Sequence, residues 1–310
     1  MSADARLLVA TALLMTVLAA LAGAGLVLDP RVIDGAPAWL KPLKFAVSVA
    51  IYAATLAWMT RFLDAWPRVR TVTARTTALV LVVEVGLIGL QAARGTSSHF
   101  NTSSVTDGVI FAVMGVGIML QTVVAAVFTV ALWRQKFEDD ALGWAVRLGM
   151  AIAVVGALTG GLMTRPTPAQ LALAAESGGS IPRAGAHTVG APDGGPGLPG
   201  TGWSTTHGDL RVGHFVGLHA MQALPLVLVV VGRRRGQASR RQLVFGAAAL
   251  YGGLFALLLA QALAAQSVAA PRGLFLALLG VWAVAVAGFV LRFTRGRADD
   301  GAERAVWGAA

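Results

Sequence analysis

The chain has 310 residues, of which 56% are hydrophobic and 13% are charged. A soluble domain has about 25% charged residues, so this chain carries too few charges to cover a surface exposed to water. It contains no cysteine, which excludes disulfides, iron–sulfur clusters and zinc sites built from thiolates.

Apolar segments of about 20 residues recur along the whole chain, and a helix of this length crosses the hydrocarbon core of a bilayer. Continuous apolar runs indicate membrane helices, since the strands of a barrel would show alternation. The sequence therefore predicts an all-α fold, a polytopic transmembrane helical bundle that forms one integral membrane domain over residues 1–310. The eight predicted spans are residues 7–28, 45–63, 76–93, 108–133, 142–163, 212–231, 243–264 and 274–291.

The basic residues are distributed unevenly over the loops between these spans. If the N-terminus is cytoplasmic, 17 of the 25 lysines and arginines fall in cytoplasmic segments and 8 in outer segments. Basic residues are enriched in the cytoplasmic loops of membrane proteins, so we expect both termini to be cytoplasmic in the cell (inner or plasma) membrane. The net charge of +10 is interpreted in the same way, as an orientation signal and not as a surface for nucleic acid.

One predicted outer loop, residues 164–210, is much longer than the others and is rich in glycine and proline. This composition is typical of a flexible linker. Long loops in compact proteins are also often functional lids. Composition alone leaves both interpretations open.

Three polar motifs and all five histidines fall on the outer side of this topology. The motif at residues 39–45, WLKPLKF, opens the second span, and ordinary helix capping and interface anchoring can explain it. The motif at residues 91–101, QAARGTSSHFN, leaves the third span, and the motif at residues 207–222, HGDLRVGHFVGLHAMQ, enters the sixth. Histidines inside or beside apolar helices are not explained by anchoring.

Three polar side chains are expected near the middle of the membrane. At 1.5 Å per residue from the nearest outer arginine, Glu84 lies about 15 Å, His219 about 12 Å and Gln261 about 16 Å below the interface. An ionisable residue at such depth costs at least about 2.5 kcal/mol on insertion scales, which makes it a functional candidate. The alternatives are a protonated Glu84 that only packs helices together and a neutral His219 bonded within the bundle. Gln121 and the pair Gly156 and Gly160 are expected to serve helix packing.

These positions predict a polar pocket that opens to the outside. Its floor would be Glu84, Gln261 and His219, its walls Gln91, Gln222 and His214, and its rim Lys41, Lys44, Arg94, Arg211 and His99. His214 and His219 are about 140° apart around a helix, so one metal ion cannot easily bind both.

At RGTSSHFN and GDLRVGHFVGLHAMQ the chain resembles a group of bacterial multi-pass membrane proteins for which no activity is established. Similar versions of WLKPLKF and of GAHTVGAPDGGPGLPGTGWS (residues 185–204) accompany these strings in that group, so the likeness extends over most of the chain. The resemblance implies that the loop 164–210 is an ordered lid, which would bring His187 and Asp193 over the pocket.

Three functions are compatible with such a pocket. The first is binding of a small ligand or of a haem or metal cofactor, with His99, His214 and His219 as candidate metal ligands, because imidazole is the commonest metal ligand. The second is a proton-coupled small-molecule transporter or a channel, in which Glu84 would couple to protons, although the inner half has few polar groups. The third is an enzyme that acts on a lipid-borne substrate at the outer face, but the sequence identifies no nucleophile. The pocket for a ligand or cofactor is favoured, and enzymatic activity is left open.

The predicted orientation can be tested by labelling single cysteines, because the natural chain has none. A membrane-impermeant maleimide added to intact cells is expected to label Ser180→Cys, which lies in the loop 164–210. Glu138→Cys, in a predicted cytoplasmic loop, should be labelled only after the cells are lysed. Labelling with the opposite pattern would reverse the orientation.

Overall fold

The computed structural model describes residues 1–233 and 235–307, and it is mostly helical. The first half contains the helices α1 (Ala3–Leu28), α2 (Leu40–Met59), α3 (Pro67–Ala93) and α4 (Val105–Arg134), with a 3-10 turn, η1 (Thr60–Phe62), after α2. The second half contains α5 (Asp140–Leu158), α6 (Gly160–Met163), α7 (Pro168–Glu176), α8 (Leu210–Leu218), α9 (Ala220–Gly232), α10 (Gln237–Leu263) and α11 (Gly273–Trp307).

Within the described residues, seven helices are long and apolar enough to cross a membrane, and the bent pair α8–α9 makes an eighth if it is one span. These helices suggest a multi-pass membrane protein, in agreement with the predicted all-α bundle. Each predicted span coincides largely with one helix, or with two consecutive helices at 142–163 and 212–231, and several helices begin earlier than expected. α3 begins at Pro67 and not at residue 76, and its proline occupies the first turn, where no backbone N–H is needed.

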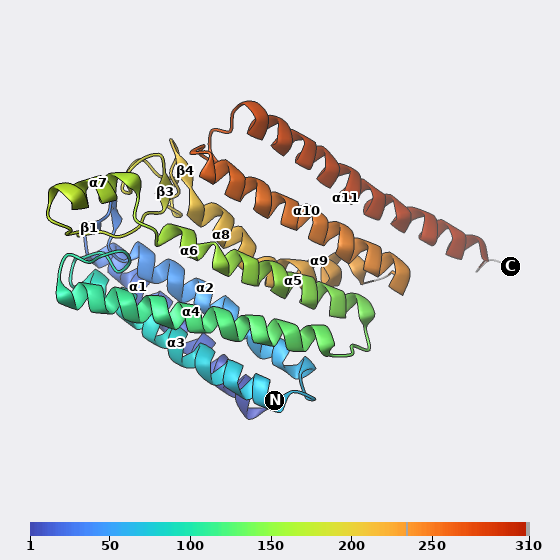
Figure 1. The fold of residues 1–310 in the computed structure, drawn as a ribbon. Coiled ribbons are helices and arrows are strands. Elements are labelled where there is room, and N and C mark those ends of the chain that lie inside the picture. The colour runs from blue at the N-terminus through green and yellow to red at the C-terminus, as the bar shows by residue number, and fades with distance from the viewer. Residues whose placement is uncertain (234, 308–310) are drawn as a thin grey trace.

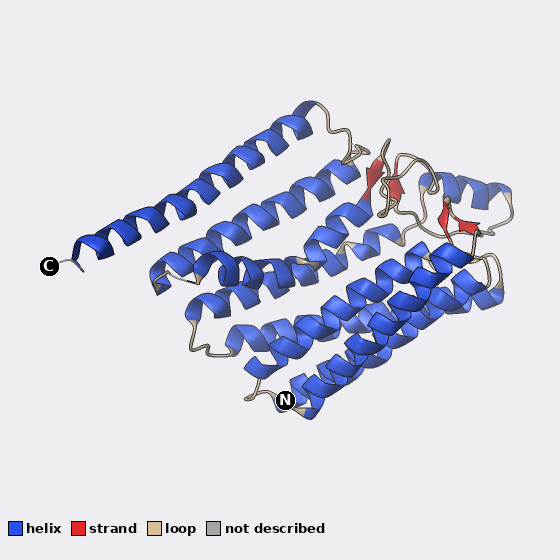
Figure 2. Ribbon diagram, turned by 180° about the vertical axis from the view of Figure 1, so that it is seen from behind, coloured by secondary structure: helices blue, strands red, loops and turns tan. Residues whose placement is uncertain are grey.

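Four short strands form two antiparallel pairs at one end of the bundle. β1 (Val32–Ile33) pairs with β2 (Ala36–Pro37), and β3 (Thr188–Val189) pairs with β4 (Gly208–Asp209). Together with α7 they lie at what we call the strand end, whereas α1 begins and α11 ends at the opposite end (Figures 1 and 2).

The bundle is built from two sets of helices that meet at α4 and α5. α1, α2 and α3 pack together, α3 packs on α4, and α5 packs on α8, α9 and α10. α11 lies along α10 at the edge of the bundle, and none of the residues in its most apolar window is buried (Figure 1). Large apolar side chains exposed in this way, such as Leu274 and Val284, are expected to face lipid.

The predicted sixth span is not one straight helix. α8 and α9 meet at His219 with a bend of 50°. Pro225 lies inside α9 and has no N–H to donate to the carbonyl of Met221, which weakens the ladder of hydrogen bonds just after the bend.

Close glycine contacts hold α5 against the bent pair. A Cβ on Gly156 would lie 2.6 Å from the carbonyl carbon of Gly217, and one on Gly160 would lie 3.2 Å from the ring of His214. The packing role predicted for this pair of glycines is confirmed.

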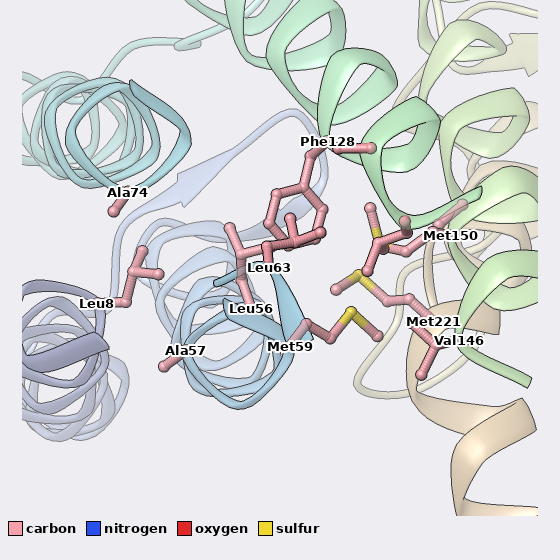
Figure 3. Close-up of a cluster of buried hydrophobic side chains, with 13 residues drawn as sticks. Leu8, Leu56, Ala57, Met59, Leu63, Ala74, Phe128, Val146, Met150 and Met221 are labelled. Carbon is pink, nitrogen blue, oxygen red and sulfur yellow. The ribbon is translucent and has the colours of Figure 1, made fainter. Parts of the chain in front are cut away.

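The half of the bundle near the opposite end has an apolar core. Its centre is a cluster of buried side chains that includes Leu56, Met59, Leu63, Phe128 and Met150 (Figure 3). The side chains of this cluster come from α1 to α5, from the residues after α2 and from α9. Buried polar groups at this end are few among the described residues and include the hydroxyls of Thr60, Thr73 and Thr129.

Gly156→Ala is expected to lower the free energy of unfolding by roughly 1–3 kcal/mol, because the added methyl group must displace backbone atoms of α8. Thermal unfolding in detergent, followed by tryptophan fluorescence, measures this. Gly86→Ala is the matched control, since no atom lies within 4 Å of its Cβ position and alanine favours helix by up to about 1 kcal/mol. Equal stability of the two variants would contradict the close contact.

Candidate functional site

Glu84 is buried in α3 at a distance from any helix end. It lies nine residues before Ala93, about 13 Å along the axis from the strand end of α3. Its side chain is 3% exposed. Thr77, Glu84 and Gln91 are all buried and are spaced seven residues apart, so they lie on one face of α3, as expected for the latter two.

His99 comes from the loop after α3 and contacts this carboxylate. Its Nε2 lies 3.4 Å from Glu84 Oε1, with the imidazole side chain 21% exposed. A loop that starts at Arg94 can place His99 there only if it folds back along α3 into the bundle. Phe100, which is buried and has a positive φ of 62°, follows His99 in this turn. His99 was expected at the rim of a pocket, and it instead lies against the expected floor.

Asn101 fixes the shape of this re-entrant loop. Its Nδ2 donates to Thr96 Oγ1 at 2.9 Å and to the Ser97 carbonyl at 3.3 Å, and its Oδ1 accepts from the backbone N–H of Ser103 at 3.1 Å. In a partly buried loop without regular secondary structure, these bonds supply hydrogen-bond partners for the polar backbone groups.

The imidazole of His99 is held on both sides. Its Nδ1 lies 3.1 Å from Ser98 Oγ, and its ring packs 5.7 Å from Phe45 and 6.1 Å from Phe100, measured between ring centroids. Burial lowers the pKa of His99 well below its usual value, and the positive charge of Lys41 lowers it further. His99 is therefore neutral at pH 7.

Lys41 lies in the first turn of α2 and has no close counter-ion. Its Nζ lies 6.0 Å from the centroid of the Phe45 ring, and its charge interacts with Asp34 and Glu84. Among the described residues, no carboxylate lies within 4.0 Å of this ammonium group.

The other predicted rim cations are engaged in structural contacts. Arg94 pairs with Asp107 of α4 at 2.8 Å, and Gln91 donates to the same carboxylate at 2.9 Å, so both join α3 to α4. Lys44 donates to the carbonyl of Thr201 at 2.6 Å. Arg211 pairs with Asp209 and also donates to the carbonyl of Gly202 at 2.6 Å.

The segment 164–209, here called the lid, is ordered and closes the strand end. Arg183 connects it to the loop after α1, because its guanidinium lies 2.8 Å from Asp34 and 3.3 Å from Asp193. Asp193 also accepts the N–H groups of His187 and Thr188, at 3.0 and 2.8 Å. These contacts favour an ordered lid over a flexible linker, and the role of the segment stays a prediction.

The lid is also bonded to the re-entrant loop that carries His99. The N–H of Ala184 donates to the carbonyl of Phe100 at 2.8 Å, and the N–H of Thr102 donates to the carbonyl of Pro182 at 3.0 Å. The ring of His187 packs 4.9 Å from Phe100. Movement of the lid is thus coupled to the position of His99.

His214 and His219 lie away from the contact between Glu84 and His99. His214 Nδ1 lies 2.8 Å from the carbonyl oxygen of Gly156, and His219 packs 4.3 Å from the ring of Phe215. Among the described residues, no group of three or more histidines and carboxylates is arranged to hold a metal ion. The structure does not bring the three candidate ligands, His99, His214 and His219, together.

Gln261 is not near mid-membrane, which corrects the expected floor. The depth was counted as if the helix reached Arg272, but α10 ends at Leu263 and a loop follows. Gln261 lies in the last turn, where its Nε2 donates to the carbonyl of Ser267 at 2.8 Å.

Two glutamines form a polar layer deeper in the bundle, on either side of α2. Gln121 of α4 donates to the hydroxyl of Tyr52 at 3.0 Å, and Gln222 of α9 donates to Thr55 Oγ1 at 3.2 Å. The Oε1 atoms of both glutamines are buried without a hydrogen-bond partner in the described structure.

Sequence reasoning missed Ser98, Asp34 and Arg183. Ser98 stands beside His99 in the string RGTSSHFN, which was a usable signal. Asp34 and Arg183 are 149 residues apart, and no local pattern connects them.

Comparison of the chain with protein-family models, with curated proteins and with solved structures gives no match.

Asp193→Asn is expected to speed amide hydrogen exchange in residues 183–204 by roughly tenfold, which corresponds to about 1.4 kcal/mol of lost lid stability. The reason is that the variant loses the charged acceptor shared by Arg183 and His187. Mass spectrometry of exchange measures it, with the exposed Glu176→Gln as control. Unchanged exchange in residues 183–204 would contradict this role.

Acid is expected to loosen the lid. Burial alone raises the pKa of Asp193, but its bonds with the His187 ring and two backbone N–H groups outweigh this and hold the pKa well below the usual range. A depressed carboxyl pKa stabilises the folded lid above the unfolded value of about 4, and this stability is lost as the pH falls below it. Burial lowers the pKa of His187, so acid below about 6.5 acts in the same direction. Protection factors in the lid, which correct the measured exchange for its intrinsic slowing in acid, should therefore fall on acidification, and protection factors that stay constant or rise in acid would contradict the assignment.

Proposed function

We propose that this protein binds a small anionic molecule at Lys41, Glu84 and His99, from the outer side of a cell membrane, beneath the lid. The observation that carries this proposal is the ammonium group of Lys41, which lies beside a buried acid and base without a counter-ion of its own.

The named charges around the site balance when Glu84 is ionised and leave one positive charge when Glu84 is protonated. Asp34 and Asp193 share Arg183, Asp107 pairs with Arg94, and Asp209 pairs with Arg211. Lys41 and Lys44 remain, three residues apart on the first turns of α2, where the helix dipole adds positive potential. Besides Asp34, Glu84 is the described carboxylate whose charge interacts with Lys41. An anion that binds while Glu84 is protonated would balance the remaining positive charge.

The ligand would enter only after the lid moves, because Glu84 is nearly inaccessible in the closed state. Arg183 and the backbone bonds to Phe100 and Thr102 would have to break first. Opening of the lid would carry His99 away from Glu84. Entry of the ligand would therefore be linked to the protonation states of His99 and Glu84. The outer location rests on the excess of basic residues in the opposite loops.

A haem or metal cofactor does not fit the described residues. A bis-histidine haem needs two imidazoles that face one another, whereas His214 is bonded to a backbone carbonyl and His219 lies on an aromatic ring. We therefore assign no cofactor chemistry to the site.

Anion binding can be measured by thermal unfolding of the full-length protein in detergent, with sodium phosphate, acetate or succinate as probes at constant ionic strength. At one hundred times the dissociation constant, a bound anion stabilises the fold by about 2.7 kcal/mol. This stabilisation is expected for the natural protein, to be lost in Lys41→Gln and to be retained in Lys136→Gln at the opposite end. No stabilisation by any of these anions, or full stabilisation of Lys41→Gln, would refute the proposal.

Proton-coupled transport is the second candidate, and the layer formed by Tyr52, Thr55, Gln121 and Gln222 favours it. This layer continues the polar face of α2 below the site, since Lys41, Phe45, Tyr52 and Thr55 are spaced as one helix face. The apolar cluster with Met59 and Met150 blocks the remaining distance. Uptake of a stabilising anion into proteoliposomes, abolished in Glu84→Gln, would favour transport. Binding without uptake would leave the protein as a receptor or enzyme.

A further inference from the structure

Ser98, His99 and Glu84 form a continuous chain of contacts beneath the lid. Ser98 Oγ lies 3.1 Å from Nδ1 of His99, and Nε2 of the same ring lies 3.4 Å from Glu84 Oε1. A single tautomer is compatible with both contacts, because the hydroxyl can donate to Nδ1 while Nε2, the ring nitrogen near the carboxylate, carries the hydrogen; the Nε2 contact is not a formed hydrogen bond.

Sequence neighbours do not produce this arrangement by themselves. Thr206 and His207 repeat the local contact, with Oγ1 2.9 Å from Nδ1. Among the described residues, no carboxylate lies within 4.0 Å of His207. The contact to Glu84 exists only because the loop folds back into the bundle.

A hydroxyl, an imidazole and a carboxylate in this order are the groups that activate a serine nucleophile. A serine hydroxyl is a weak nucleophile until a neighbouring base accepts its proton, and the base works best when a third group orients it. His99 is neutral and can accept the proton, and Glu84 would stabilise the imidazolium that forms. The spacing of 3.4 Å is long for a hydrogen bond, but contacts of this kind often shorten when substrate binds.

We propose that Ser98 is the nucleophile of an acyl-transfer reaction, with His99 as general base and Glu84 as a positioning residue. This inference rests on the proposed binding site, from which it takes the substrate class: an ester or thioester that carries an anionic group for Lys41.

The reaction balances with water as the second substrate. Ser98 Oγ forms a bond to the acyl carbon, its proton passes to His99 Nδ1, and the alcohol or thiol leaves with that proton. Water, deprotonated by His99, then attacks the acyl-serine, releases the carboxylic acid and restores the serine hydroxyl. The ground-state site has Ser98 4% exposed, so turnover would require lid opening.

An uncharged alkyl fluorophosphonate with a fluorescent tag tests this on the full-length protein in detergent. The expected reaction forms an Oγ–P bond, breaks the P–F bond and releases fluoride. Labelling is expected to be lost in Ser98→Ala and to persist in Ser97→Ala, whose serine instead donates to Asp34 at 2.6 Å. His99→Gln should slow it by about 10²–10⁴-fold, the usual contribution of a general base. The rate should also increase with pH as His99 loses its proton.

The same measurement is repeated with Arg183→Ala, which frees the lid from Asp34 and Asp193 and should speed labelling. No labelling in either background, or labelling that survives Ser98→Ala, would overturn the proposal. Lys41→Gln separates the two proposals, because the uncharged probe does not need Lys41. If the protein is labelled but anions do not stabilise it, the nucleophile proposal stands and the anion-site proposal is refuted. If anions stabilise the protein but it is not labelled, the anion-site proposal stands and the nucleophile proposal is refuted.

Discussion

The buried carboxylate of Glu84 is the constraint on which the strand end depends. A charged or even a neutral carboxyl group loses its water in an apolar helical bundle, and only polar partners inside the bundle can compensate. In this protein the partner is His99, which reaches Glu84 because its loop turns inward. This inward course of the loop depends on two further contacts. Asn101 forms hydrogen bonds within the loop, and the lid forms a backbone hydrogen bond with Phe100.

The lid illustrates how a glycine-rich and proline-rich segment becomes ordered. It has little regular structure, and its shape comes from Asp193, which gathers the N–H groups of His187 and Thr188 together with the guanidinium of Arg183. A carboxylate that accepts several hydrogen bonds favours its charged form and fixes the residues around it. Close passage of the main chain is also needed, since a Cβ at Gly35 would lie 2.6 Å from the carbonyl oxygen of Gly194.

The two ends of the bundle differ in their chemistry. Near the opposite end, Met59, Leu63, Phe128 and Met150 fill the space between helices with apolar side chains, while the strand end gathers charged groups and aromatic rings. A protein that only spanned the membrane would need no such gathering of ionisable groups. This asymmetry directs attention to one end. Lys41, which has no carboxylate within 4.0 Å among the described residues, and the contacts from Ser98 to Glu84 are the basis of the function proposed for that end.

The sequence by itself determined the class of protein, the helices and the polar end. Apolar runs and sparse charge predicted the helical spans because a membrane-crossing helix must be apolar over about 20 residues, and Glu84 stood out because a carboxyl in such a run is costly. What it could not determine were contacts made by irregular backbone. His99 lies six residues after the end of a helix, and no periodicity describes a loop that folds back, so its partner Glu84 emerged only from the tertiary structure. The same holds for Arg183 and Asp34, and for Gln261, whose depth depended on where α10 ends.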